Sequence, residues 1–291
     1  MTKRGRLYKF EGLGNDFLVS FDADLFEGAS TELVANLTDR HRGVGADGLI
    51  FGLPGRSPGV DLEMVLFNND GSRAQISGNG IRCLAHAARL FGLVKKDSFL
   101  ISTDAGVREV GLLGVASDEQ ILAQVSMGMV EYLCPAFSKS YSFNGKQWLG
   151  TDLDIGNPHL VLVLKDQMDQ KFESRTSLDE LDLAALGMAI ENEYPNGTNV
   201  EWLAINPEAS EVTMRVWERG VGITQACGSG SSAAGFLVID QGIRQGPVSV
   251  VNPGGVLSVS IRPENREVIL RGNSSFVGTI ELARHFNPWR T

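Results

Sequence analysis

A single thiol stands between a charged pair and a glycine-rich turn in the second half of the chain. Cys227 opens the run Cys-Gly-Ser-Gly, and the pair Glu218-Arg219 lies shortly before it. Residues 231–239 are first small and then apolar, which predicts a helix that is buried from its first turn and begins at the glycines. A helix N-terminus stabilises negative charge, so Cys227 is placed to ionise. The alternative is a structural cysteine packed beside a tight turn.

A second stretch in the first half of the chain has the same form. Ser77-Gly-Asn-Gly echoes Cys227-Gly-Ser-Gly, and a helical run rich in alanine follows it as far as Phe91. In both places a hydroxyl or thiol residue precedes Gly-x-Gly. One such motif is weak evidence, but two of them in opposite halves indicate pseudo-symmetry.

With these motifs the chain resembles the diaminopimelate epimerase family, a family of amino-acid epimerases that work without a cofactor. The resemblance spans nearly the whole chain, and the motifs that carry it are Gly12-Leu-Gly-Asn-Asp-Phe, Arg40-His-Arg-Gly-Val-Gly-Ala-Asp-Gly, Asn68-Asn-Asp-Gly-Ser, Gly156-Asn-Pro-His, Asn196-Gly-Thr-Asn-Val-Glu, Glu218-Arg-Gly-Val-Gly and Ala226-Cys-Gly-Ser-Gly. Both catalytic residues of the family are cysteines. Ser77 stands here at the first of those positions, which is a departure from the family pattern.

The resemblance also implies a set of site residues. The catalytic residues would be Cys227, Ser77, His159 and Glu218. The substrate-binding residues would be Asn15, Asn68, Asn157, Asn199, Glu218 and Arg219. Apart from the resemblance, the glycine turns are expected to bind substrate through the backbone N–H groups of Gly78, Asn79, Gly228 and Ser229. His159 would tune the pKa of a cysteine, and Gly48 replaces a glutamine that contacts substrate in some family members.

General chemistry agrees with several of these roles. Arginine binds a carboxylate through two parallel hydrogen bonds and glutamate accepts from an ammonium, so Glu218 and Arg219 fit the distal centre of a diamino acid. The alternatives are a surface ion pair for Glu218-Arg219 and, for His159, a core histidine with satisfied hydrogen bonds. Asn15 could equally hydrogen-bond its own turn.

Inversion at an α-carbon requires a base on one face and a proton donor on the other. The two glycine turns would supply these groups, together with N–H donors for the substrate's α-carboxylate. No lysine stands in a context typical of a pyridoxal Schiff base, and no cluster of His, Asp and Glu suggests a metal site. We therefore expect no cofactor and no metal.

The composition limits the classes of molecule that the protein is expected to bind. The net charge is −9 and there is no basic cluster, which argues against nucleic acid. The basic residues near Met1 are followed by no apolar run long enough for a signal peptide or a membrane helix. Three cysteines without a CxxC pair are typical of a reducing compartment. We expect a cytoplasmic protein with a small amino-acid substrate and no membrane partner, and a homodimer as the commonest default.

The remaining pattern predicts an α+β fold of two pseudo-symmetric halves. Each half would be a mainly antiparallel, barrel-like sheet around a central helix, with the active site in the cleft between them. The first half would cover residues 1–129, joined by the C-terminal segment 276–291, and the second half residues 130–275. Two outer helices are predicted, over 30–41 with Ser30 or Thr31 as cap and over 177–191 with Ser177 as cap.

The function that these observations predict is interconversion of LL- and meso-diaminopimelate in the synthesis of lysine and peptidoglycan precursors. Ser77 would impair the reaction. Three alternatives stay open: an amino-acid racemase of the same fold with another substrate, a dehydratase, and an inactive amino-acid-binding homologue.

Overall fold

The chain folds into two compact units, each built mainly from strands. The structure is a computed structural model that describes residues 5–117, 119–165, 178–205 and 211–283. The first unit comprises Met1–Val125 and Gly272–Thr291, and the second unit comprises Ser126–Arg271. These divisions fall four residues before the expected ones at 129/130 and 275/276. Strands β8 (Gln120–Gly128) and β18 (Val268–Glu281) run unbroken through both crossing points, so no turn marks the division in the sequence.

Among its described residues, the first unit has three helices and seven strands besides β8 and β18. They are β1 (Arg6–Gly12), β2 (Asn15–Ser20), α1 (Ala23–Glu27), α2 (Thr31–Thr38), β3 (Gly48–Pro54), β4 (Leu62–Asn68), β5 (Arg73–Ala74), α3 (Gly78–Leu90), β6 (Ser98–Thr103) and β7 (Gly106–Ser117). Strand pairing runs from β1 through β2, β3, β4, β6, β7, β8 and β18 and returns to β1. The pairing closes on itself, so these eight strands form a barrel.

The second unit repeats this plan. Its elements are β9 (Glu131–Tyr132), β10 (Lys139–Phe143), β11 (Lys146–Asp154), β12 (Pro158–Lys165), η1 (Leu178–Glu180), α4 (Leu183–Glu191), β13 (Asn199–Ile205), β14 (Glu211–Glu218), β15 (Gly222–Thr224), α5 (Gly228–Asp240), β16 (Val248–Asn252) and β17 (Gly255–Ile261). The strands pair in the order β11, β12, β13, β14, β16, β17 and β18. Both units have parallel pairs at the same places, β2 with β3 and β4 with β6 in the first, β12 with β13 and β14 with β16 in the second. The predicted pseudo-symmetry is confirmed.

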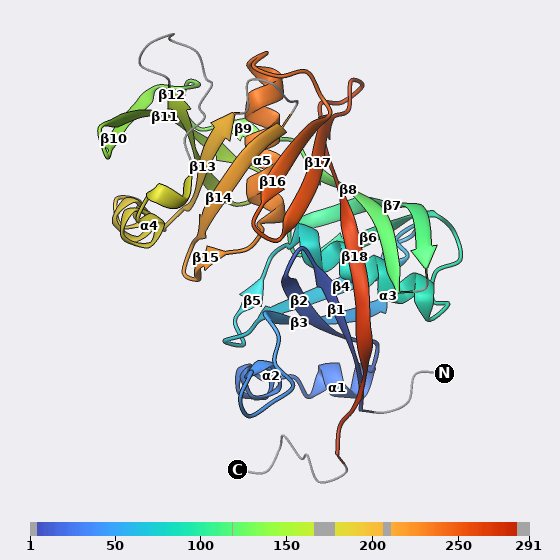
Figure 1. Ribbon diagram of the computed structural model, residues 1–291. Helices are drawn as coiled ribbons and strands as arrows, with labels where there is room; N and C mark the ends of the chain where they lie inside the picture. Colours follow the sequence, from blue (N-terminus) through green and yellow to red (C-terminus); the bar gives the residue numbers. More distant parts are fainter. Residues whose placement is uncertain (1–4, 118, 166–177, 206–210, 284–291) are drawn as a thin grey trace. The chain divides into compact units, whose positions relative to one another are not determined.

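One central helix packs against the strands of each unit (Figure 1). Helix α3 contacts β1, β2, β3, β4 and β7, and helix α5 contacts β12, β13, β16 and β17. Both helices are buried from their first residue for eleven positions, over 78–88 and over 228–238. Both end two residues before a glycine with positive φ, Gly92 at 72° and Gly242 at 66°, a backbone angle that residues with a side chain rarely adopt.

Each unit has its own apolar core. In the first unit, Leu33, Val34 and Leu37 of α2 pack with Leu49 and Phe51 of β3. In the second unit, Trp148 and Trp202 lie at the centre of a cluster that includes Leu160 and Leu162. Each fully buried aliphatic or Phe side chain stabilises the fold by about 1.5–3 kcal/mol, so the two clusters make each unit rigid.

The two outer helices differ from the prediction. Helix α2 begins after Ser30, whose hydroxyl accepts from the Leu33 N–H, but it ends at Thr38 rather than near residue 41. Helix α4 begins at Leu183 and is capped by Asp182, whose carboxylate accepts from the Ala185 N–H. The predicted start at residue 177 is therefore wrong, because Asp182 caps the helix. The residues just before this cap form the short η1 rather than a turn of α4. Ser177 itself lies outside the described residues.

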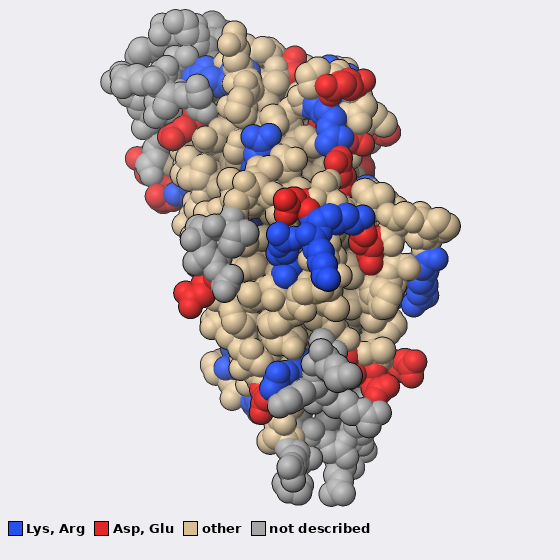
Figure 2. Space-filling view, turned by 90° about the vertical axis from the view of Figure 1, so that its right-hand side faces the viewer, with Lys and Arg blue, Asp and Glu red and all other residues tan. Residues whose placement is uncertain are grey.

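The surface carries charges of both signs. On the face in Figure 2, Lys and Arg side chains lie among Asp and Glu side chains. In the described part of the chain, no helix combines the length and apolarity that a membrane crossing would need.

Candidate active site

Cys227 is the N-cap residue of α5, as its sequence context predicts. Its Sγ accepts the N–H of Gly230 at 3.4 Å and lies 3.4 Å from the hydroxyl of Ser229. Cys227 as a whole is 5% exposed. At a helix N-terminus the first N–H groups have no acceptor within the helix, so the amides of Gly228 and Ser229 are suited to bind an anion.

Two carboxylates lie close to this thiol. Glu218, at the end of β14, accepts a hydrogen bond from the hydroxyl of Thr224 and is hydrogen-bonded to Cys227. Burial raises the pKa of the Glu218 carboxyl, and these two hydrogen bonds oppose the rise. Burial, then the charges of Glu218 and Glu201, raise the pKa of the Cys227 thiol well above its usual value. The expectation that the helix N-terminus ionises Cys227 is therefore wrong for this arrangement, because desolvation and two anions outweigh the helix.

His159 and Glu201 form a buried pair on adjacent strands. His159 Nδ1 lies 2.7 Å from Glu201 Oε1, and both side chains are fully buried. His159 Nε2 lies 3.1 Å from the Asn157 side-chain oxygen. Both ring nitrogens are thus engaged by other side chains. In this arrangement neither ring nitrogen of His159 is directed at the sulfur of Cys227.

The predicted binding residues of the second unit converge on the same region. The Asn199 amide donates to the backbone oxygen of Pro158 at 2.9 Å, and its oxygen accepts the backbone N–H of Arg219 at 3.0 Å. Arg219 lies in the turn between β14 and β15 and is exposed, and its guanidinium donates to the backbone oxygen of Asn196 at 3.3 Å. Asn199 therefore fixes the backbone from which this arginine extends.

Ser77 is the N-cap residue of α3, as Cys227 is of α5. Its hydroxyl accepts the N–H of Gly80 at 3.0 Å. Asn79 donates to the side-chain oxygen of Asn15 at 3.2 Å, and the Asn79 oxygen accepts from the guanidinium of Arg82 at 2.8 Å. Arg82 is fully buried, and burial lowers its pKa to about 10, which leaves it a cation at neutral pH.

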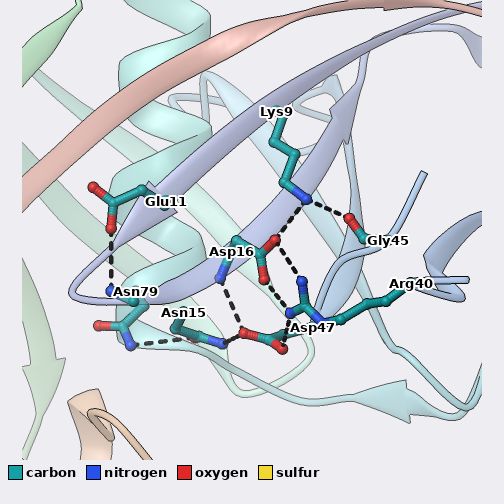
Figure 3. A network of polar contacts seen from close by, with 9 residues as sticks. Lys9, Glu11, Asn15, Asp16, Arg40, Gly45, Asp47 and Asn79 are labelled. Carbon is teal, nitrogen blue, oxygen red and sulfur yellow. Dashed lines mark hydrogen bonds and ion pairs between the residues drawn. The ribbon is translucent and has the colours of Figure 1, made fainter. Parts of the chain in front are cut away.

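A charged network extends from these amides to the surface of the first unit (Figure 3). Asn15 donates to Asp47 at 2.7 Å, and Arg40 bridges Asp47 at 2.7 Å and Asp16 at 2.6 Å. Lys9 pairs with Asp16 at 2.6 Å and donates to the backbone oxygen of Gly45. Although burial opposes it, hydrogen bonds from Arg40 and Lys9 hold the pKa of Asp16 below its usual value. The amides of Asn15 and Asn79 are thus held between a surface carboxylate and a buried cation.

Asn68 and Gly48 are paired residues at the ends of β4 and β3. The Asn68 amide donates to the hydroxyl of Ser72 at 3.0 Å, within the turn that leads to Ser77. A Cβ at Gly48 would lie 2.6 Å from the backbone oxygen of Phe67, so a glutamine could stand there only if the strands moved.

Sequence reasoning missed two buried charges that lie behind the turns. Glu201 stands between apolar residues of β13, two positions after Asn199 and therefore on the same face of the strand. Arg82 lies in helix α3 within the run of eleven buried residues, between Ile81 and Cys83. A charged residue inside an apolar run is rarely buried without a partner, and this signal could have identified both.

The arrangement has the groups for proton transfer at carbon. A thiol hydrogen-bonded to a carboxylate can give up its proton to that carboxylate, and the α5 amides can bind the carboxylate of the substrate whose α-proton is removed. Over the described ranges, no three His, Cys, Asp or Glu side chains group so as to hold a metal ion.

Comparison with known proteins identifies the same motifs. The family model described as "Diaminopimelate epimerase" matches residues 7–133 and 152–277. A protein of Synechococcus sp. (strain JA-2-3B'a(2-13)) named diaminopimelate epimerase is 36% identical over 283 residues, covering 94% of this chain and 96% of its own. A protein of the same name from Mycobacterium sp. (strain KMS) is 37% identical over 297 residues, with 94% and 96% covered.

Solved structures share the fold at low sequence identity. A phenazine biosynthesis protein of the PhzF family from Bacillus anthracis has a TM-score of 0.71 at 16% identity, with 97% of this chain and 100% of that chain covered. A probable proline racemase from Agrobacterium radiobacter K84 also has a TM-score of 0.71, at 14% identity, with 97% and 94% covered.

Proposed function

We propose that this chain, which belongs to the diaminopimelate epimerase family, interconverts LL- and meso-diaminopimelate by removing and returning an α-proton. The observation that carries the proposal is the Cys227 thiol at the N-terminus of α5, hydrogen-bonded to Glu218. The names of relatives that match almost the whole chain support the choice of substrate.

Cys227 acts as the acid and base on one face of the substrate in this proposal. Because burial favours the neutral thiol, the thiolate forms when the substrate brings positive charge or when Glu218 takes the proton. Backbone N–H groups of Gly228 and Ser229 bind the α-carboxylate and stabilise the charge that spreads onto it when the proton leaves. Cys227 and Glu218 are therefore one functional unit.

Ser77 serves the other face in this proposal, with the amides of Gly78 and Asn79 as the matching anion site. A hydroxyl has a pKa far from neutrality and is an inefficient proton donor, so the Ser77 face is the slower one. Inversion requires both turns to reach one substrate. Exchange of the α-proton without inversion, by removal and return at Cys227, requires only the Cys227 turn.

In this proposal the distal end of the substrate is bound by one charged pair and four asparagine amides. Arg219 binds the distal carboxylate and Glu218 the distal ammonium. The amides that complete the set are Asn15, Asn68, Asn157 and Asn199. The proposal includes no cofactor, a cytoplasmic location and a homodimeric state, which cell fractionation and analytical ultracentrifugation would test.

The decisive experiment follows both isotopes and stereochemistry. The purified protein is incubated with LL- and with meso-diaminopimelate in deuterated water, while α-proton exchange and inversion are measured separately. We expect exchange with at least one stereoisomer and slower inversion. If diaminopimelate shows neither exchange nor saturable binding, while the folded protein is intact by circular dichroism, the substrate assignment is wrong.

A further inference from the structure

A fully buried carboxylate that has no place in the reaction above lies behind the Cys227 turn. Glu201 is 0% exposed and packs against the first turn of α5, where a Cβ on Gly230 would lie 2.5 Å from Glu201 Oε1. Its Oε1 is 2.7 Å from His159 Nδ1. Its Oε2 has no hydrogen-bond partner within the part of the chain that the structure describes. Burying a carboxylate in this way costs free energy, which indicates that Glu201 has a structural or functional role that offsets the cost.

The number of protons needed for the hydrogen bonds of His159 indicates what this role is. An amide oxygen can only accept, so the 3.1 Å contact between Asn157 Oδ1 and His159 Nε2 requires a proton on Nε2. The contact between Nδ1 and Oε1 requires one more proton, either on the nitrogen or on the oxygen. Among the described residues, Glu218 interacts electrostatically with both members of this pair and Cys227 with Glu201. The dyad therefore holds two protons and is neutral as a whole.

We infer that Glu201 is a positioning residue that fixes His159 as an Nε2–H donor and, through it, fixes the orientation of the Asn157 amide. The oxygen of that amide is occupied by His159, so Asn157 can offer a ligand only its N–H groups. Asn157 is partly exposed in the loop between β11 and β12, where a ligand can reach it. In combination with the proposed function, on which this step rests, Asn157 selects a substrate group that accepts hydrogen bonds, a carboxylate rather than an ammonium.

The first unit provides an independent parallel. There the Asn79 oxygen accepts from the buried Arg82, and Asn79 offers its N–H to Asn15. A buried charge sets the direction of an asparagine amide in both units, a cation directly in the first and an anion through an imidazole in the second.

The test uses the small number of histidines, four in the whole chain. Protein labelled with ¹⁵N-histidine is studied by NMR between pH 6 and 9, and His159→Gln identifies the resonances of His159. We expect Nε2 of His159 to carry a proton throughout this range in the wild-type protein. A His159 Nε2 without a proton would overturn the inference, whatever the activity of the protein.

Two variants separate positioning from mere packing. Glu201→Gln can still donate to Nδ1, so it should keep Nε2 protonated and leave the KM for diaminopimelate close to that of the wild type. Glu201→Met has similar length but no hydrogen bond, so the two imidazole tautomers should mix and KM should rise by about 10- to 100-fold, with a smaller change in kcat. An unchanged KM and tautomer in Glu201→Met would overturn the inference.

The outcomes distinguish this inference from the proposed function. If diaminopimelate is neither bound nor turned over but Nε2 is protonated, the proposed substrate fails and the role of Glu201 in the dyad stands. If Glu201→Met does not fold, the comparison of wild type with Glu201→Gln still decides, because loss of the Nε2 proton in both would contradict the hydrogen-bond direction.

Discussion

The turns at Ser77 and Cys227 have the same backbone and opposite electrostatics. In each, the N-cap side chain accepts the N–H of the third residue after it, Gly80 or Gly230, and a buried helix follows. Behind the first turn lies the cation Arg82, and behind the second lie the carboxylates of Glu201 and Glu218. The difference shows that the Gly-x-Gly motif determines the path of the chain, while the residues packed behind it determine which charge the turn tolerates.

This contrast has a chemical consequence for each turn. The cation behind Ser77 favours negative charge at a residue whose hydroxyl cannot ionise near neutral pH. Burial, and then the carboxylates of Glu218 and Glu201, disfavour ionisation of Cys227, the residue that could otherwise ionise. The side chains of Ser77 and Cys227 are consequently uncharged until a substrate arrives. A substrate with ammonium groups would shift the protonation equilibrium of Cys227 toward the thiolate.

Removing the thiol should have the largest effect. Cys227→Ala should reduce both α-proton exchange and inversion by about 10⁴-fold, because the proposal assigns proton transfer to and from the substrate on that face to the thiol. Cys227→Ser is the matched control, since it makes the two turns alike and restores a cap without restoring a thiol. Exchange in Cys227→Ala within tenfold of the wild-type rate would mean that another group, such as Glu218, is the base.

Removing the buried cation should mainly affect stability. Arg82→Met leaves the oxygens of Gly78, Asn79 and Asn273 without this donor and should lower the free energy of unfolding by about 3–5 kcal/mol. Urea denaturation would measure it. Arg89→Met, on the surface of the same helix, is the control and should cost under about 1 kcal/mol. Equal losses in the two variants would show that Arg82 contributes no more than a surface arginine.

Restoring a second thiol should make the two turns more alike in chemistry. Ser77→Cys should raise the inversion rate by about 10²-fold, because a thiol is a better proton donor than a hydroxyl near neutral pH. Exchange on the Cys227 face should stay the same. If the wild-type protein already inverts as fast as Ser77→Cys, another group in the site activates the Ser77 hydroxyl.

Substitution of Arg219 tests the proposed contact between the second unit and the distal carboxylate of the substrate. Arg219→Lys keeps the charge but loses the two-point geometry, so substrate binding should weaken by about 1–3 kcal/mol. Thermal unfolding should barely shift, because the side chain is exposed. Equal affinity of the two proteins, measured by calorimetry, would remove Arg219 from the substrate site.

The smallest effect should come from the capping hydroxyl of the first turn. Ser77→Ala leaves the Gly80 N–H without its acceptor and should lower the free energy of unfolding by about 1 kcal/mol. Ser77→Thr keeps a hydroxyl and should lose less. A larger loss in Ser77→Thr than in Ser77→Ala would show that space, not capping, is limiting at this position.

The sequence predicts what is decided locally. The starts of α2, α3 and α5 depend on cap residues and glycines that are adjacent in the chain, and these predictions are confirmed. The start of α4 was wrong because Ser177 and Asp182 are both plausible caps and the choice depends on how the helix packs. The site residues divide in the same way.

Motifs identified Cys227, Ser77 and the asparagines near them, but gave no role to the buried charges behind them, although Glu201 ends one of the motifs. Glu201 and Arg82 make sense only when His159, Asn79 and the helix turns surround them, and those partners come from other elements of the fold. The ionisation of Cys227 was predicted wrongly for the same reason. Helix position is visible in the sequence, whereas desolvation by neighbouring strands is not.

The closing strand of the first barrel also sets the order in which the molecule can be completed. Strand β18 pairs with β1 and β8, yet it is separated from them by the whole second unit. As the chain leaves the ribosome, β1 and β8 therefore remain open edges until the last strand has been synthesised, and open edges are sites of wrong pairing. Both units need β18 before they are complete, and the first unit, whose other strands are synthesised first, waits longest for it.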